Sequence, residues 1–93
     1  MNGEGAVRFL VAGRVQGVGY RWFAAHHADR LGIRGLARNL PDGRVEVIAV
    51  GAAAAIAELE RLLSVGPPTA SVRTVERSDL SGTAPDFPGF GTA

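Results

Sequence analysis

The stretch Gly13-Arg14-Val15-Gln16-Gly17-Val18-Gly19-Tyr20-Arg21 decides the architecture of this chain. It lies between residues 6–12, which alternate like a strand, and residues 20–31, which have the apolar spacing of a helix. Its three glycines permit the tight turns and positive φ angles of a short strand-to-helix connection. Backbone N–H groups in such a connection converge at a helix start, where the helix dipole favours negative charge. The stretch therefore predicts an anion-binding loop, with the Arg21 guanidinium as a planar donor for phosphate or carboxylate.

Strand and helix patterns alternate outward from this loop. Further strands are expected over residues 34–40, 44–50 and 70–77, with a helix over 52–64 and a weak final strand over 89–93. Residues 1–5 are expected to be a loose leader, and residues 78–88 to be rich in turns. The order βαββαβ predicts an α+β fold of the ferredoxin-like kind, a sandwich of a mostly antiparallel sheet with two helices on one face.

Local signals refine this expectation. Pro41-Asp42-Gly43 is a turn sequence, so the strands on either side of it should form a hairpin. In the second strand of that hairpin, Val45 and Val47 are expected to face the core, and Glu46 to face outward. The valines at 72 and 75 break strict alternation, which indicates a β-bulge in the 70–77 strand.

Composition limits the classes of function. The 93 residues predict one domain, residues 1–93, and 46% apolar with 20% charged residues is typical of a globular protein. A net charge of +1 argues against a nucleic-acid binder, and the absence of cysteine excludes disulfides, thiolate catalysis and cysteine-ligated zinc. No apolar run is long enough to span a membrane and no secretory signal is visible, so we expect a cytoplasmic monomer without membrane or nucleic-acid partners.

Two motifs resemble those of one enzyme family. Residues 13–21 look like the phosphate-loop signature of the acylphosphatases, and Gly35-Leu36-Ala37-Arg38-Asn39-Leu40-Pro41-Asp42-Gly43-Arg44-Val45-Glu46 resembles their second signature. The motifs have the family's order and separation, and the match spans residues 6 to about 77. The chain departs from the family at Ala37, where a larger apolar residue is usual, and in its final Gly91-Thr92-Ala93. Glycine and alanine are poor strand residues, so the final strand should be weak.

The resemblance implies the hydrolysis of a small-molecule acyl phosphate to a carboxylate and inorganic phosphate, without metal or cofactor. It implies that Arg21 holds the substrate phosphate and that Asn39 orients the attacking water, as the catalytic residues. The remaining substrate-binding residues that it implies form the loop: Arg14, Val15, Gln16, Gly17, Val18, Gly19 and Tyr20.

These roles agree with the chemistry of the residues. An acyl phosphate has a good leaving group, so the site mainly has to position the phosphoryl group and stabilise its charge. A neutral amide at Asn39 can hold water without repelling the anionic phosphate, as a carboxylate would. No side chain near the motifs is an obvious general base, which leads to the hypothesis that the substrate phosphate accepts the proton of the water.

Other interpretations stay open from the residues alone. The motifs also occur in carbamoyl-phosphate-handling domains of larger transferases, and a non-catalytic anion- or RNA-binding module of the same fold is a second alternative. Asn39 by itself is typical of a turn. His26 and His27 are adjacent on a helix and lack partners at metal-ligand spacing, which favours a solvated or partly buried pair. The remaining arginines near the motifs, Arg34, Arg38 and Arg44, fit either a pocket mouth or a solvated sheet face.

Overall fold

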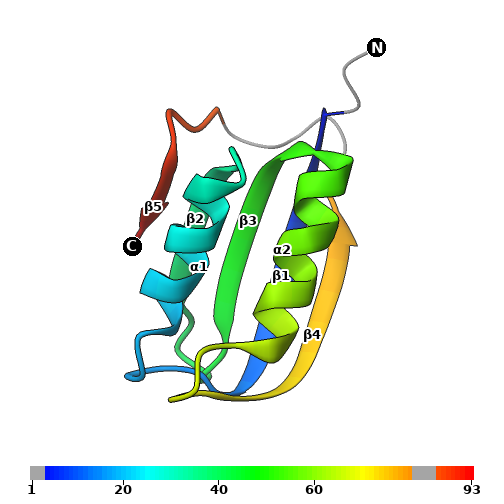
Figure 1. Ribbon diagram of the computed structural model, residues 1–93. Coiled ribbons are helices and arrows are strands. Elements are labelled where there is room, and N and C mark those ends of the chain that lie inside the picture. The colour runs from blue at the N-terminus through cyan, green and yellow to red at the C-terminus, as the bar shows by residue number, and fades with distance from the viewer. Residues whose placement is uncertain (1–3, 81–85) are drawn as a thin grey trace.

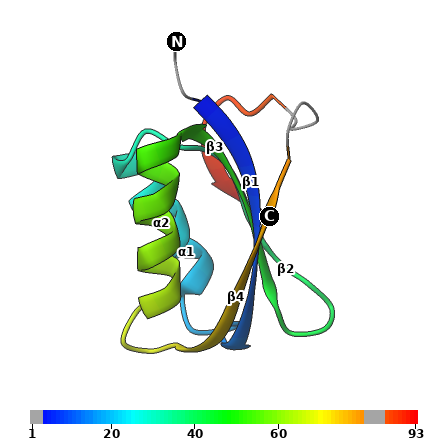
Figure 2. The same ribbon diagram turned by 90° about the vertical axis from the view of Figure 1, so that its right-hand side faces the viewer.

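The computed structural model describes residues 4–80 and 86–93, and the helices lie side by side on one face of the sheet (Figure 1). A view from the side shows the two layers separately, and both helices of the described residues lie on the same face of the sheet (Figure 2). This confirms the predicted ferredoxin-like architecture. The elements, in chain order, are β1 (Glu4–Arg14), α1 (Tyr20–Arg30), β2 (Arg34–Asn39), β3 (Val45–Ala52), α2 (Ala53–Val65), β4 (Ser71–Asp79) and β5 (Phe90–Thr92).

The sheet has the strand order β4-β1-β3-β2-β5. β3 pairs antiparallel with both β1 and β2, and β4 pairs antiparallel with β1. β5 is the exception to the antiparallel pattern, because it runs parallel to β2 at the edge of the sheet. Since β3 separates β1 from β2, these two strands run in the same direction, and α1 is the crossover between them.

The core lies between the sheet and the two helices. The predicted inner residues of β1 and the predicted stripe of α2 are buried as expected. In α1 the buried positions are Tyr20, Ala24 and Ala28, whereas Phe23 and His27 of the predicted stripe are only half-buried. The two buried residues of α1 after Tyr20 are alanines, whose small side chains suit a close approach of the helix to the sheet.

The structure corrects several of the predicted boundaries. β1 already begins at Glu4, because Glu4 and Gly5 pair with the end of β3, so this part of the expected leader is strand. β4 extends through Ser78 and Asp79, which pair with β1 instead of forming the expected turn. Residues 1–3 and 81–85, the rest of the leader and part of the turn-rich segment, lie outside the described residues.

The third correction concerns the first glycine of the opening stretch. Gly13 and Arg14 belong to β1 and not to the loop, because they pair with Val72 and Ser71 of β4. The register shifts between Ala12 and Gly13, which leaves Arg73 as an extra residue in β4 and confirms the predicted bulge. A Cβ at Gly13 would lie 2.2 Å from the carbonyl oxygen of Ser71, so the close strand approach here requires glycine.

Glu46 lies on the sheet face that carries no helix, as predicted, yet its side chain is only 7% exposed. It accepts hydrogen bonds from Nε of Arg8 at 2.5 Å and Nε of Arg38 at 2.6 Å. Burial alone would raise the pKa of Glu46, but the two guanidinium groups outweigh it and hold that pKa below its ordinary value. Glu46 therefore joins β1, β3 and β2 as a charged carboxylate.

Replacing Glu46 by Gln should lower the free energy of unfolding by about 2 kcal/mol near pH 7, less than for a fully buried pair because both arginines are partly exposed. Since the pKa of Glu46 is lowered on folding, the stabilisation exists above its ordinary value of 4.5 and disappears as the pH falls through the lower folded value. Urea unfolding of both proteins near pH 7 and near pH 3 measures this difference.

The matched control is Glu58→Gln, which removes an exposed pair with Arg61 on α2 and should change stability much less. A stability difference between the wild type and Glu46→Gln that is equal at both pH values would contradict the ionic role of Glu46.

Candidate active site

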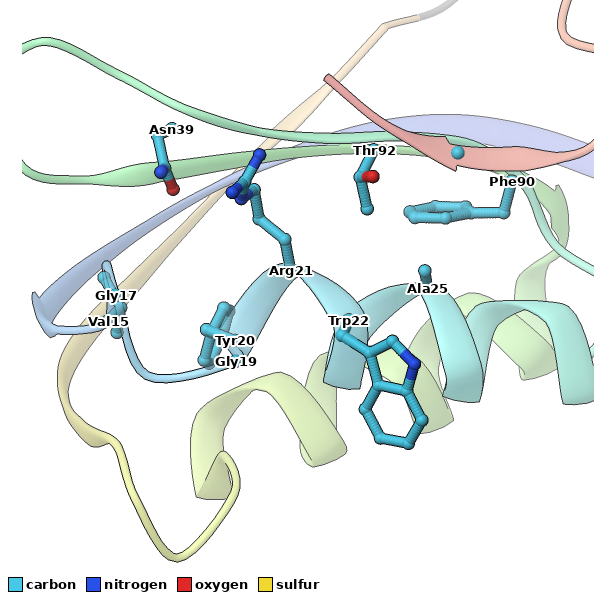
Figure 3. A pocket seen from close by; sticks show the side chains of 11 residues that line it. Val15, Gly17, Gly19, Tyr20, Arg21, Trp22, Ala25, Asn39, Phe90 and Thr92 are labelled. Atoms are coloured by element: carbon cyan, nitrogen blue, oxygen red, sulfur yellow. The ribbon is translucent and has the colours of Figure 1, made fainter.

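A cavity of about 400 Å³ lies at the C-terminal ends of β1 and β2, where α1 begins (Figure 3). The β1–α1 loop forms one side of it, and β5 forms another. The residues that line the cavity are Val15, Gly17, Gly19, Tyr20, Arg21, Trp22, Ala25, Asn39, Phe90, Gly91 and Thr92.

The loop reaches α1 through two glycines in the left-handed conformation. Gly17 has φ 74° and Gly19, the N-cap of α1, has φ 80°. No side chain caps the N-terminus of α1, and its first turn contains no acidic residue. The first N–H groups of the helix are therefore not compensated by a side chain, which suits the binding of an anion.

Two hydrogen bonds connect the loop and the start of α1 to residues 63–69, at and after the end of α2. Tyr20 is buried, and its hydroxyl donates to the carbonyl oxygen of Leu63 at 2.7 Å, which ties the start of α1 to the end of α2. Burial raises the pKa of Tyr20 well above its ordinary value, so the side chain stays a neutral donor. Oγ1 of Thr69 donates to the carbonyl oxygen of Val18 at 2.7 Å. The loop is thus anchored to the α2–β4 side of the molecule.

Arg21 and Asn39 enter the cavity from different elements. The half-buried side chain of Arg21 points from α1 toward the sheet and lies between Asn39 and Thr92 in Figure 3. Its Nη1 donates to the backbone oxygen of Ala93 at 2.8 Å, which holds the guanidinium against the end of β5. Asn39 is the exposed last residue of β2. The structure thus brings a fixed cation and a neutral amide to one opening.

Of the nine residues selected from the sequence, some line the cavity and the others lie beside it. The cavity is lined by six of them: Val15, Gly17, Gly19, Tyr20, Arg21 and Asn39. Arg14 is exposed at the end of β1, and Val18 contributes the carbonyl that Thr69 binds. The side chain of Gln16 turns to the β2–β3 hairpin, where it donates to two carbonyl groups.

The other side of the cavity is formed by Trp22 and Ala25 of α1 and by residues 90–92, none of which was selected from the sequence as a site residue. Ala25 follows Arg21 by four positions, so helical spacing was an available signal for it. Trp22 was expected from the sequence to be a packing or pocket-wall residue, and it lines the cavity. Nothing local marks residues 90–92, because only the parallel pairing of β5 with β2 brings them to the site.

The two histidines considered from the sequence are not among the residues that line the cavity. His26 stacks on Trp22 at a ring-centroid distance of 5.2 Å, and His27 lies 3.0 Å from a guanidinium nitrogen of Arg30. Burial lowers the pKa of His27, and the charges of Arg30 and His26 lower it further. Within residues 4–80 and 86–93, no three acidic or histidine side chains gather as metal ligands, and no helix is long and apolar enough to cross a membrane.

The three arginines that fitted either a pocket mouth or a sheet face are engaged with carboxylates. Each forms an ion pair within the described part of the chain: Arg34 with Glu4, Arg38 with Glu46 and Arg44 with Asp42. None of the three is among the residues that line the cavity.

Comparison with known proteins identifies the family. The family model for acylphosphatase matches residues 7–91. An acylphosphatase of Alkalilimnicola ehrlichii is 52% identical over 79 residues, which are 85% of this chain and 89% of that protein. One of Vibrio cholerae is 46% identical over 83 residues, 89% of this chain and 90% of that protein. The structure of an acylphosphatase from Coxiella burnetii has a TM-score of 0.91 and 33% identity, and the match covers 99% of this chain and 94% of that one.

These matches confirm the resemblance that the two motifs carry, and they do not favour a carbamoyl-phosphate-handling domain or a non-catalytic module. The chain belongs to the acylphosphatase family and is an enzyme that hydrolyses acyl phosphates.

Proposed function

We propose that Arg21 and residues 14–20, which comprise the end of β1, the β1–α1 loop and the first residue of α1, bind the phosphate of the substrate. The observation that supports this most strongly is the position of the Arg21 guanidinium, which lies in the cavity beside the uncapped start of α1. A guanidinium supplies two parallel donors to phosphate, and the helix start supplies backbone N–H groups and a favourable dipole. Together they would stabilise the charge of the phosphoryl group both in the substrate and during its transfer.

In the same proposal, Asn39 orients the water. The amide has both a donor and an acceptor, so it can hold a water molecule in one orientation next to a bound phosphate. The oxygen of that water attacks phosphorus, the bond between phosphorus and the acyl oxygen breaks, and the carboxylate leaves. A phosphate oxygen accepts the proton of the water, so the products are a carboxylate and inorganic phosphate. Chemistry of this kind depends mainly on position and electrostatics.

We further propose that residues 1–93 act as one domain and as a monomer in the cytoplasm, on small acyl phosphates and not on nucleic acids. The cavity accommodates a small molecule, and the sheet face without helices carries the arginines that pair with Glu46. Strands β1 to β4 contain one aromatic residue, Phe9, which is buried in the core. Modules that bind single-stranded RNA usually carry aromatic residues at such a face.

The direct test is the hydrolysis of benzoyl phosphate in the presence of a chelator. Arg21→Ala should lower kcat/KM by at least about 10²-fold, the cost of removing one key donor to a developing charge. Arg21→Lys should remain strongly impaired, because an ammonium cannot reproduce the two-pronged contact. Near-normal turnover of Arg21→Lys would show that positive charge alone suffices, and an inactive wild type would overturn the proposed mechanism altogether.

Asn39→Ala should behave differently, since it removes the contact with water and leaves the phosphate contacts in place. We expect kcat to fall about 10²-fold while the inhibition constant of inorganic phosphate stays within about threefold of the wild type. A loss of phosphate affinity equal to the loss of kcat would instead assign Asn39 to substrate binding.

If a phosphate oxygen of the substrate accepts the proton of the water, no histidine is needed as a general base. Because His26 and His27 lie outside the cavity lining, His26→Gln and His27→Gln should retain the wild-type dependence of kcat on pH. A steep limb near the ordinary histidine pKa that either substitution abolishes would replace the substrate phosphate with a histidine as general base.

A further inference from the structure

The side chain of Gln16 connects the two halves of the active site. Gln16 lies in the β1–α1 loop, and its Nε2 donates to the carbonyl oxygen of Leu40 at 2.8 Å and to that of Arg44 at 3.0 Å. A side-chain amide has two N–H donors, and both are used here. The contact is partly buried, which limits competition by water for these hydrogen bonds.

The two acceptors stand at the ends of the β2–β3 turn. The N–H of Leu40 donates to the carbonyl of Arg44 at 2.8 Å, and the N–H of Gly43 donates to the carbonyl of Leu40 at 3.1 Å. Gln16 therefore adds a bond to each of two carbonyls that already close the turn. Leu40 directly follows Asn39, so the amide of Gln16 holds the backbone one residue beyond the end of β2.

The sheet itself does not supply this connection. β3 separates β1 from β2, so no backbone ladder joins the loop to the end of β2. Across residues 4–80 and 86–93, the hydrogen bonds between residues 15–19 and residues 39–44 are the two that Gln16 donates. Val15 also anchors the loop by its burial in the core, and the side-chain hydrogen bonds of Thr69 and Tyr20 hold it on the side of the molecule away from Asn39.

We infer that Gln16 is a positioning residue, whose side chain sets the distance between the phosphate-binding loop and Asn39. This inference rests on the proposed roles of the loop and of Asn39. In this role the side chain of Gln16 contacts neither the attacking water nor the substrate. It fixes two separately folded segments relative to each other, and a displacement of about 1 Å between reacting groups can reduce a rate about 10²-fold.

The test is Gln16→Met, which keeps the length of the side chain and removes both donors. We expect kcat for benzoyl phosphate to fall about 10- to 100-fold, with the dissociation constant of inorganic phosphate within about threefold of the wild type. In an Asn39→Ala background, Gln16→Met should change kcat by less than about threefold, because the group that Gln16 positions is already absent.

Thr69→Val is the matched control. It also removes one side-chain hydrogen bond to the loop, at Val18, but that bond does not lead to Asn39. We expect Thr69→Val to change kcat by less than about threefold, and any effect to be additive with Asn39→Ala. Urea unfolding of each variant verifies that the protein is folded under the assay conditions.

Three results would overturn the inference: a wild-type kcat in Gln16→Met, an equal effect of Gln16→Met with and without Asn39, or a phosphate affinity that falls as much as kcat. Equal losses in Thr69→Val and Gln16→Met would assign the effect to general loosening of the loop, which also overturns it. Failure of the proposed mechanism has a different signature, namely a fully active Asn39→Ala or a wild type without activity.

Discussion

The parallel direction of β1 and β2, imposed by the antiparallel strand β3 between them, is the constraint on which the site depends. It brings the C-terminal residues of both strands and the first turn of α1 to the same end of the sheet. If β2 ran in the opposite direction, its six residues would carry Asn39 about 20 Å away from the loop. Arg21 and Asn39 thus lie together because of topology and not because of their distance in sequence.

Strands β1, β3 and β2 are connected by side-chain contacts on both faces of the sheet. On one face, buried side chains of the sheet pack against the helices. On the other face, the carboxylate of Glu46 on β3 receives Arg8 from β1 and Arg38 from β2. Arg38 precedes Asn39 in β2, and Gln16 donates to the carbonyl oxygen of Leu40, the residue that follows Asn39. Successive residues around Asn39 are therefore tied to different neighbours, which restrains the strand end without a direct contact to the amide itself.

Most of the fold could be predicted from the sequence, because its signals are local. Alternation in β1, the stripe of α2 and the Pro41-Asp42-Gly43 turn depend on residues near each other in the chain. The membership of Gly13 in β1 was not predictable in this way, since a glycine before a loop has the same local pattern as one at a bulge. What distinguishes them is the backbone of Ser71, a residue remote in sequence.

The residues of the site could also be predicted where a local motif marks them, but their long-range contacts could not. The motifs selected Arg21 and Asn39, and both line one cavity. The burial of Glu46 was not foreseen, because alternation predicts the face of a sheet but not whether arginines from two neighbouring strands cover it. The hairpin contact of Gln16 and the contribution of β5 were missed for the same reason, as both depend on partners that only the assembled sheet provides.

The shortness of β5 has a consequence for the local stability of the site. β5 has three residues, of which Gly91 and Thr92 are exposed, and the N–H groups of Gly35 and Ala93 secure its two ends to β2. A short edge strand with few buried contacts opens at a much lower free energy than the core. When β5 separates from β2, the cavity loses one wall and Arg21 loses its acceptor, while the core remains folded. The free energy needed to lose the active geometry is therefore lower than the free energy of unfolding. The first depends on β5, and the second depends on the strands of the core.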